Sequence, residues 1–377
     1  MAGVTPAATV KPTRVLVVDD SAIVRKLLTD ALRGQPDIEV VGAASDPFMA
    51  RDLILRHEPD VVTLDVEMPR MDGLTFLGRL MEHHPVPVII VSSLTQSGSA
   101  ASIEALRLGA VDVIPKPGGP YSVGQVTERL IQRIRGLRAT PMRLTRAAAE
   151  RPAGAGRAPA AAGSWRKLNG LILVGASTGG TQAIEGLLTR LPADTPPIAI
   201  VQHMPAAFTR AFADRLNGSC PMTVREAQGG EWLERGVAYI APGDRHMVLE
   251  GAGLRVRTAL KNGPLVQYQR PAVDVLFHSA ARLHGAPMVA LLLTGMGADG
   301  ADGMVALRKA GVETIAEDEQ SCVVFGMPKE AIARGGASQV ATLWAMPSLI
   351  HAALSRPSAV SETTRPAAQT GAPQGPS

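Results

Sequence analysis

Residues 171–180 read LILVGASTGG, an apolar run that ends abruptly in a cluster of small residues around Ser177. A short apolar run followed by glycines and a helical pattern indicates a buried strand, a sharp turn and a helix, the repeating unit of an α/β fold. Residues Gly175–Gly179 fit the pattern G-x-S-x-G, in which the serine lies on that turn. Ser177 is therefore either a nucleophile or a hydroxyl in a phosphate-binding or purely structural turn.

The surroundings of the turn weaken the phosphate interpretation without removing it. The sequence has no G-x-x-x-x-G-K-[ST] pattern, and no acidic residue closes a strand about twenty residues further on. The flanking glycines leave the Ser177 hydroxyl accessible. The start of the next helix supplies backbone N–H groups where negative charge develops during attack on a carbonyl.

A nucleophilic serine requires a base, and the chain has eight histidines. His203 ends the apolar run IAIVQH, so we expect it at the same sheet edge as Ser177. His246, in the stretch APGDRHM, is a second candidate for the pocket. The remaining histidines are expected on surface helices or in the scaffold: His57, His83, His84, His278, His284 and His351.

The base in turn requires a carboxylate that orients it. Asp299 follows the most apolar run of the chain in MVALLLTGMGADG and is the expected partner, whereas Asp302 is expected to be solvated. The turn before Asp299 can present the backbone N–H of Met296 to an oxyanion. The resulting order Ser, His, Asp differs from the Ser, Asp, His order of the α/β-hydrolases.

The whole second half, residues 165–355, is predicted to be a doubly wound, largely parallel α/β serine-hydrolase domain. Its expected strands are LNGLILVGAS, PIAIVQH, GVAYIAP, MVALLLTG and GVETIAE, with helices after Gly179, Ala206, Asp274 and Ala298. Residues 139–164, rich in Ala, Pro and Arg, are predicted to be a flexible linker, and residues 356–377 a disordered tail.

The first half, residues 14–138, alternates five β-branched runs with five amphipathic stretches. The runs are RVLVV, IEVVGA, VVTLD, PVIIVSS and VDVI. This alternation predicts a flavodoxin-like domain with five parallel strands, in which functional residues lie beyond the carboxyl ends of the strands. The residues at those ends are Asp19, Asp20, Asp65, Ser92, Ser93 and Lys116.

Three of these strand-end residues are carboxylates, which repel one another unless a hard cation such as Mg²⁺ binds between them. With Mg²⁺ bound, Asp65 could attack a phosphoryl donor and retain an acyl phosphate. Lys116 would then pair with the phosphoryl oxygens, and the Ser92 hydroxyl could donate a hydrogen bond to them.

The ordered motifs VVDDS, LDVEMPRMDG and PKP show that this half resembles the receiver domain of bacterial response regulators over essentially its whole length. Serine at Ser92 in place of threonine, and Pro115 before Lys116, depart from the commonest pattern but remove no reacting group. The resemblance implies phosphorylation at Asp65 and Mg²⁺ held by Asp19, Asp20, Asp65 and the backbone carbonyl of Glu67.

After the receiver and linker come GASTGG, QHMP, APGDRHM, RPAVDVLF, LLTGMGADG and SCVVFGMP, in that order. Over residues 14–354 the chain thus resembles the chemotaxis response-regulator protein-glutamate methylesterases. The resemblance implies hydrolysis of glutamate 5-methyl esters on chemoreceptor helices, with methanol released, and deamidation of selected receptor glutamines. The implied roles are Ser177 as nucleophile, His203 as base, Asp299 as orienting acid, the Met296 backbone as oxyanion donor, and Thr178 as a residue lining the site.

Partners and location follow from the same resemblance and from composition. The expected partners are methyl-accepting chemoreceptors as substrate and a chemotaxis histidine kinase as phosphodonor, with membrane contact only through the receptors. No cofactor is expected for the ester chemistry. Only two cysteines and no apolar leader among 377 residues predict a cytoplasmic protein.

Two other classes of function remain open at this point. The second half could bind a partner without catalysis, in which case replacing Ser177, His203 or Asp299 would leave function intact. It could instead bind DNA, as the outputs of many receivers do. However, the net charge is only +4, aromatic residues make up 3%, and no helix-turn-helix pattern is present, so no nucleic-acid partner is expected.

Overall fold

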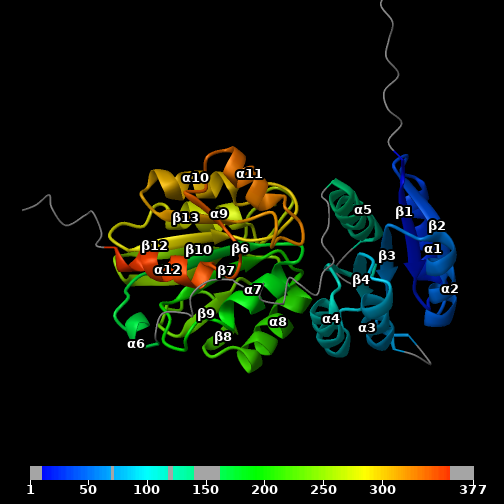
Figure 1. Ribbon diagram of the computed structural model, residues 1–377, viewed down its shortest axis with the longest axis horizontal. Helices are drawn as coiled ribbons and strands as arrows, with labels where there is room; N and C mark the ends of the chain where they lie inside the picture. Colours follow the sequence, from blue (N-terminus) through cyan, green and yellow to red (C-terminus); the bar gives the residue numbers. More distant parts are fainter. Residues whose placement is uncertain (1–10, 69–71, 118–121, 140–161, 357–377) are drawn as a thin grey trace, which may run out of the picture.

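The computed structural model describes residues 11–68, 72–117, 122–139 and 162–356, which form two α/β domains side by side (Figure 1). Most of the predicted linker and tail, residues 140–161 and 357–377, lies outside the described residues. Helix α5 (Val123–Ala139) ends and helix α6 (Ala162–Trp165) begins inside the predicted linker range. None of the helices in the described ranges combines the length and the apolar character needed to cross a bilayer.

The first domain confirms the predicted five-stranded parallel sheet. Its described strands pair in the order β2-β1-β3-β4-β5, and every pair is parallel. The elements are β1 (Thr13–Val18), α1 (Ala22–Arg33), β2 (Ile38–Ala44), α2 (Pro47–His57), β3 (Val61–Leu64), α3 (Gly73–His83), β4 (Val88–Ser92), α4 (Gln96–Leu108), β5 (Asp112–Pro115) and α5. Helix α4 begins at Gln96, because Thr95 caps it by accepting a hydrogen bond from the Gly98 N–H at 3.0 Å.

The second domain confirms a parallel α/β sheet, with strands that the sequence did not reveal. Its described strands pair in the order β14-β13-β12-β6-β7-β9-β8, all parallel. These strands are β6 (Leu171–Ala176), β7 (Ile198–Gln202), β8 (Thr223–Glu226), β9 (Val237–Ile240), β12 (Met288–Leu292), β13 (Glu313–Glu317) and β14 (Gln339–Ala341). The edge strands β8 and β14 are short and partly exposed, so they carry no continuous apolar run that would predict them.

An antiparallel hairpin, β10 (His246–Ala252) with β11 (Arg255–Lys261), lies apart from this sheet and was also not predicted. One face of the hairpin is buried, through Met247, Leu249 and Val256. The helices of the domain are α6, α7 (Gly180–Leu188), α8 (Ala206–Ser219), α9 (Val273–Ala280), α10 (Ala301–Lys309), α11 (Met327–Ala333) and α12 (Met346–Ser355).

The strand order reverses at β6. From β6 the chain moves to β7 and β9 on one side and later to β12 and β13 on the other. All six residues of β6 are buried between these neighbours. The carboxyl end of β6 is therefore a topological switch point, where parallel sheets open a crevice between diverging loops.

The two domains pack against each other through α4 and α5 of the first domain (Figure 1). Arg215 of α8 lies 2.9 Å from Glu104 of α4 and 2.9 Å from Glu185 of α7, so one guanidinium joins the two domains. The Gly179 N–H donates to the Val111 carbonyl at 3.2 Å. The interface thus includes the turn that carries Ser177.

Candidate active site

Ser177 lies on a strand-to-helix turn at the end of β6, as the sequence predicts. Its N–H donates to the Thr294 carbonyl at 3.0 Å, and its carbonyl accepts from Gly180 at 2.7 Å. Gly179 has φ 77°, and a Cβ there would lie 2.5 Å from Cβ of Val323, so this turn requires glycine. The residue Ser177 is only 2% exposed.

His203 lies beside Ser177 on the neighbouring strand end. The register pairs Ala176 with Gln202, and the His203 N–H donates to the Ala176 carbonyl at 3.1 Å. The ring Nε2 lies 2.7 Å from Oδ2 of Asp299, and both side chains are buried. Nδ1 of His203 is buried and has no hydrogen-bond partner among the described residues, so it is the ring nitrogen that remains available.

Asp299 is held as a carboxylate by donors that converge on it. Its oxygens accept the N–H groups of Val273 at 2.7 Å and Asp274 at 2.9 Å, at the start of α9. Burial opposes ionisation, but the hydrogen bond and charge of His203 and these two backbone donors lower the pKa of Asp299 below its usual value. A helix N-terminus further favours a negative charge at this position.

The other acidic residues near Asp299 differ from it in environment. Burial, followed by the Asp299 charge, raises the pKa of Asp274 to about 6. Asp302 is exposed and pairs with Arg334 at 2.8 Å, which matches the solvated position expected for it. Asp299 is thus the carboxylate that the fold directs to His203.

Thr294 connects the segments around the Met296 turn. Its hydroxyl donates to the Thr178 carbonyl at 3.0 Å and accepts from the Val324 N–H at 2.9 Å. Its own N–H donates to the Glu317 carboxyl group at 2.7 Å, and burial raises the pKa of Glu317 to about 7. These bonds fix the Met296 turn next to the serine turn. Sequence reasoning identified neither Thr294 nor Glu317, because both lie within apolar strand patterns.

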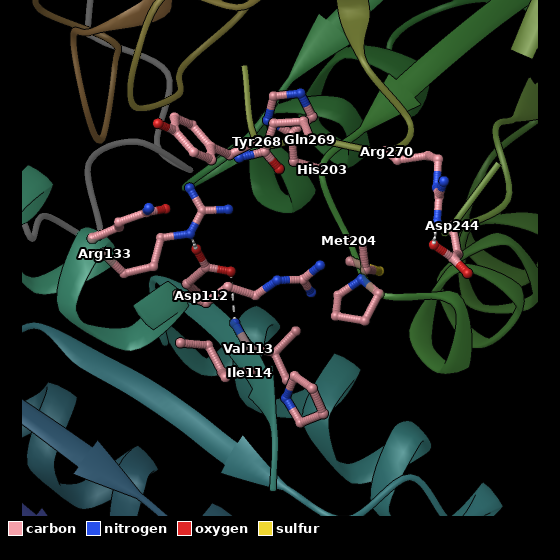
Figure 2. Close-up of a pocket in the computed structure, with 14 residues that line it drawn as sticks. Asp112, Val113, Ile114, Arg133, His203, Met204, Asp244, Tyr268, Gln269 and Arg270 are labelled. Atoms are coloured by element: carbon pink, nitrogen blue, oxygen red, sulfur yellow. Dashed lines mark hydrogen bonds and ion pairs between the residues drawn. The ribbon is translucent and has the colours of Figure 1, made fainter. Parts of the chain in front are cut away.

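The Ser177 hydroxyl is covered by the first domain. Nη1 of Arg133 in α5 lies 3.4 Å from Oγ of Ser177, while Nε of Arg133 pairs with Asp112 Oδ2 at 2.8 Å. The Thr178 hydroxyl donates to the same Asp112 oxygen at 3.3 Å. Figure 2 shows Arg133 and Asp112 facing the pocket from one side and His203 facing it from the other. No sequence motif marks Arg133 or Asp112, since they reach the serine only through the domain interface.

A cavity of about 40 Å³ lies between the domains at this point. Its wall from the second domain includes His203, Met204, Pro205, Asp244, Tyr268, Gln269 and Arg270 (Figure 2). His246, expected as a pocket candidate, instead contacts the Pro264 carbonyl at 2.9 Å and the Ala272 N–H at 3.2 Å. His246 therefore supports the loop that carries Tyr268 and does not line the cavity.

The acidic site predicted in the first domain is formed by Asp19, Asp20 and Asp65, whose carboxylate oxygens lie within 4.8 Å of one another. Lys116 Nζ lies 2.7 Å from Asp65 and 3.1 Å from Asp19. Burial raises the pKa of Asp65, and burial, partly offset by Lys116, raises the pKa of Asp19 to about 6. Three converging oxygen donors fit a hard divalent cation, which would lower the repulsion between them.

The remaining predicted receiver residues surround this acidic site. The Glu67 N–H donates to Asp65 at 3.1 Å, so the residue whose carbonyl was predicted as a ligand lies next to the aspartate. The buried Ser92 hydroxyl donates to the Gly98 carbonyl of α4 at 3.3 Å. Ser92 also accepts the Lys116 N–H through its own carbonyl at 2.7 Å. In this arrangement the Ser92 hydroxyl is engaged with α4 rather than with Asp65.

Family models and known proteins match both halves of the chain. Residues 15–127 match the response regulator receiver domain, and residues 172–350 match CheB methylesterase. A protein-glutamate methylesterase/protein-glutamine glutaminase of Syntrophus aciditrophicus is 51% identical over 330 residues, covering 88% of this chain and 96% of that protein. A protein-glutamate methylesterase/protein-glutamine glutaminase of Cupriavidus metallidurans is 52% identical over 344 residues, covering 90% of this chain and 96% of that protein.

Among solved structures, the Thermotoga maritima CheB methylesterase catalytic domain is 38% identical, with a TM-score of 0.47, and covers 49% of this chain and 98% of that one. The response regulator domain of Thermotoga maritima CheB is 46% identical, with a TM-score of 0.32. The match covers 35% of this chain and 99% of that domain.

The fold and the site define a hydrolase with a response-regulator receiver packed against its catalytic domain. The chain belongs to the protein-glutamate methylesterase/protein-glutamine glutaminase family, which it matches along almost the full length of both domains.

Proposed function

We propose that the chain hydrolyses glutamate 5-methyl esters on chemoreceptors, releases methanol, and deamidates selected receptor glutamines to glutamate. The observation that carries this proposal is the convergence of Ser177, His203 and Asp299 at neighbouring strand ends, with the His203–Asp299 contact at 2.7 Å. A buried, oriented histidine beside a serine on a sharp turn is the arrangement that acyl transfer requires.

In the acylation step, Oγ of Ser177 attacks the ester carbonyl and Nδ1 of His203 takes its proton. Asp299 stabilises the imidazolium through Nε2, where the contact is already formed. The backbone N–H of Met296 is assigned to the oxyanion, and Thr178 lines the same site. Loss of one such donor costs on the order of 10²–10³ in rate.

The imidazolium then protonates the methoxy oxygen of the tetrahedral intermediate, the bond from the carbonyl carbon to that oxygen breaks, and methanol departs, which leaves a glutamyl ester of Ser177. Water attacks this acyl-enzyme while His203 takes its proton, which releases glutamate and restores the serine. An amide is a poorer leaving group than an ester. Deamidation therefore depends more strongly on His203 as an acid. The ester chemistry requires no cofactor in this scheme.

In this proposal the receiver controls the catalytic domain through phosphorylation of Asp65. Asp19, Asp20, Asp65 and the Glu67 carbonyl would hold Mg²⁺, which neutralises phosphoryl charge when bound. Lys116 would pair with the phosphoryl group, and Ser92 would exchange its bond to the Gly98 carbonyl for one to that group. This exchange loosens the start of α4, which packs on α8 across the domain interface.

Release of α5 from the Ser177 turn would then open the catalytic site. A shift from 1% to 99% open requires about 5.5 kcal/mol of differential stability, so a partial shift is sufficient for graded activation. In this proposal the receiver, residues 14–138, controls the catalytic domain, residues 165–355, across the linker at 139–164.

The proposed setting is sensory adaptation in chemotaxis or a related chemosensory pathway. Methyl-accepting chemoreceptors are the substrates, and a chemotaxis histidine kinase is the phosphodonor to Asp65. The protein is proposed to act in the cytoplasm and to reach the membrane only through the receptors.

The test is methanol release from methylated receptor membranes by the wild type and by Ser177→Ala, each with and without acetyl phosphate. We expect acetyl phosphate to raise release by the wild type, and Ser177→Ala to lower release at least 10³-fold, in line with loss of a nucleophile. Ser219→Ala, an exposed serine at the end of α8, is the matched control and should behave as the wild type. Equal release by Ser177→Ala and Ser219→Ala would refute the serine mechanism.

A further inference from the structure

We infer that Glu317 is a positioning residue for the turn that carries Met296. Its uncharged carboxyl group holds the Thr294 peptide in place from behind, and ionisation of this group releases the turn and slows the reaction. This inference rests on the proposed function and adds to it a residue that touches neither the substrate nor the reacting atoms. Its basis is the set of hydrogen bonds around Thr294.

Thr294 lies where the chain leaves β12. The paired register of β12 and β13 ends at Leu292 and Ala316, and the next N–H, that of Leu293, donates to β6 at 2.8 Å. Successive N–H groups of a strand point to opposite sides, so the N–H of Thr294 points back toward β13. There it donates to Oε2 of Glu317 at 2.7 Å. A carboxyl side chain therefore serves as the acceptor beyond the end of the strand pairing.

The other polar groups of Thr294 hold the serine turn. Its carbonyl accepts the N–H of Ser177 at 3.0 Å. Its hydroxyl donates to the Thr178 carbonyl at 3.0 Å and accepts the Val324 N–H at 2.9 Å. The N–H, the carbonyl and the hydroxyl of this buried residue are thus all engaged. A displacement of Thr294 therefore moves Ser177 and the turn that contains Met296 relative to each other.

The turn after Thr294 packs directly on the serine and leaves little room for such a displacement. A Cβ at Gly295 would lie 2.8 Å from Cβ of Ser177 and 2.3 Å from Sδ of Met327. The Gly295 carbonyl also accepts the Met327 N–H at 2.8 Å. The distance from the Met296 N–H, assigned to the oxyanion, to the serine is therefore set by the two residues before it. A misplacement of about 1 Å in a catalytic site can cost 10²-fold in rate.

The surroundings of Glu317 favour its uncharged form. The side chain is 0% exposed, and Oε1 has no hydrogen-bond partner within the described part of the chain. An ionised carboxylate requires donors at both oxygens, and a buried charge that lacks them is costly. The uncharged carboxyl group still accepts the Thr294 N–H at Oε2. The geometry thus retains the bond to the turn without requiring a buried charge.

The groups around Glu317 agree with this assignment. Burial raises its pKa to about 7, although the Thr294 N–H and the side chains of Ser321 and Cys322 favour the ionised form. The charge of Asp318 opposes ionisation further. The neighbouring strand β14 places an alanine opposite Glu317 in the register, so it adds no charge at that position.

Ionisation of Glu317 should therefore disturb the turn. A negative charge on Oε1 is stabilised only when water or another donor reaches it, which requires the buried segments around it to separate. Because Thr294 is bonded to the same carboxyl group, the separation moves the Met296 N–H away from its position beside Ser177. Activity per folded molecule then falls as the pH rises through the pKa of about 7.

The first experiment measures kcat and KM for methanol release from methylated receptor membranes by the full chain with Mg²⁺ and acetyl phosphate. Glu317→Leu removes the acceptor of the Thr294 N–H, whereas Glu317→Gln keeps an acceptor oxygen but cannot ionise. At about pH 6 we expect Glu317→Leu to lower kcat about tenfold with KM within about twofold, and Glu317→Gln to restore kcat to within about threefold of wild type. Glu313→Leu, at the other end of β13, is the matched control and should stay within about twofold.

A pH series provides a readout that a purely structural role would not change. From about pH 6 to 8.5, the ratio of the wild-type kcat to that of Glu317→Gln should fall about threefold or more. Only the wild type ionises at this position, and the two proteins share all other titrating groups. If Glu317→Leu does not fold, this ratio decides the question by itself.

Two results would overturn the inference. One is a folded Glu317→Leu that keeps the wild-type kcat or changes KM alone. The other is a ratio of wild type to Glu317→Gln that stays constant across the pH series. Ser177→Ala separates the two proposals. Release that persists in that variant contradicts the proposed function, whereas its loss together with unaffected Glu317 variants contradicts only the positioning role.

Discussion

The guanidinium of Arg133 in the receiver lies 3.4 Å from the hydroxyl of Ser177, and the same side chain pairs with Asp112 at 2.8 Å. The hydroxyl of the proposed nucleophile is thus covered by a positively charged side chain from the other domain.

Replacing Arg133 should raise activity without phosphorylation. Arg133→Ala removes a partly buried charged contact, worth about 1–3 kcal/mol, from the closed arrangement. We expect methanol release without acetyl phosphate to rise about five- to tenfold, while release with acetyl phosphate stays similar. Arg135→Ala is the control, because Arg135 pairs with Asp37 inside the receiver. An unchanged basal rate in Arg133→Ala would contradict the inhibitory role of this contact.

Replacing Asp299 should affect the chemical step. Asp299→Asn removes the charge that holds Nε2 of His203 and stabilises the imidazolium, so we expect kcat to fall about 10²–10⁴-fold. Steady-state methanol release from methylated receptors measures this change. Asp302→Asn alters an exposed aspartate three residues away and should remain within twofold of wild type. A similar fall in kcat in both variants would contradict an orienting role of Asp299, because it would show that any change in this turn impairs the site.

Burial of Glu317 should make stability fall as pH rises. Its pKa is raised from 4.5 to about 7, so between these values the folded chain binds more protons at Glu317 than the unfolded chain. The corresponding loss of unfolding free energy from pH 4.5 to 7 is about 3 kcal/mol. Urea unfolding should show this loss in the wild type relative to Glu317→Gln, which cannot titrate.

The control for the stability measurement is Glu330→Gln, which changes a surface glutamate paired with Arg334. Its unfolding free energy should follow that of the wild type across the same pH range. A constant difference between Glu317→Gln and wild type from pH 4.5 to 7 would show that Glu317 does not titrate in this window.

Removing divalent metal should separate control from catalysis. Chelation should abolish stimulation by acetyl phosphate, because the carboxylates of Asp19, Asp20 and Asp65 then lack the cation that offsets their repulsion. Basal methanol release should persist, since no metal takes part in the proposed serine chemistry. Excess Mg²⁺ should restore stimulation in the wild type and not in Asp65→Asn. Loss of basal release on chelation would place a metal in the esterase step.

The sequence by itself determined the two α/β domains and the edge of each sheet at which function is expected. Buried runs that alternate with amphipathic helices specify parallel strands, and the carboxyl ends of such strands meet along one edge. For this reason Asp19 and Asp65 in one domain, and Ser177, His203 and Asp299 in the other, could be selected from their positions after apolar runs. The short edge strands β8 and β14 escaped detection, because partly exposed strands lack that run.

Only the tertiary structure decided which groups touch. It directs Nε2 of His203, and not Nδ1, to Asp299, and it places Asp299 at the start of α9. It also brings Arg133 onto Ser177 across 44 residues of sequence. The contacts of Asp299 form as the catalytic domain folds, and the contact of Arg133 forms when the two domains pack, so no local periodicity or motif records them. The positions of the reacting residues can therefore be predicted from the ends of the apolar strands. Their hydrogen-bond partners, their burial and the access of substrate to them depend on tertiary packing.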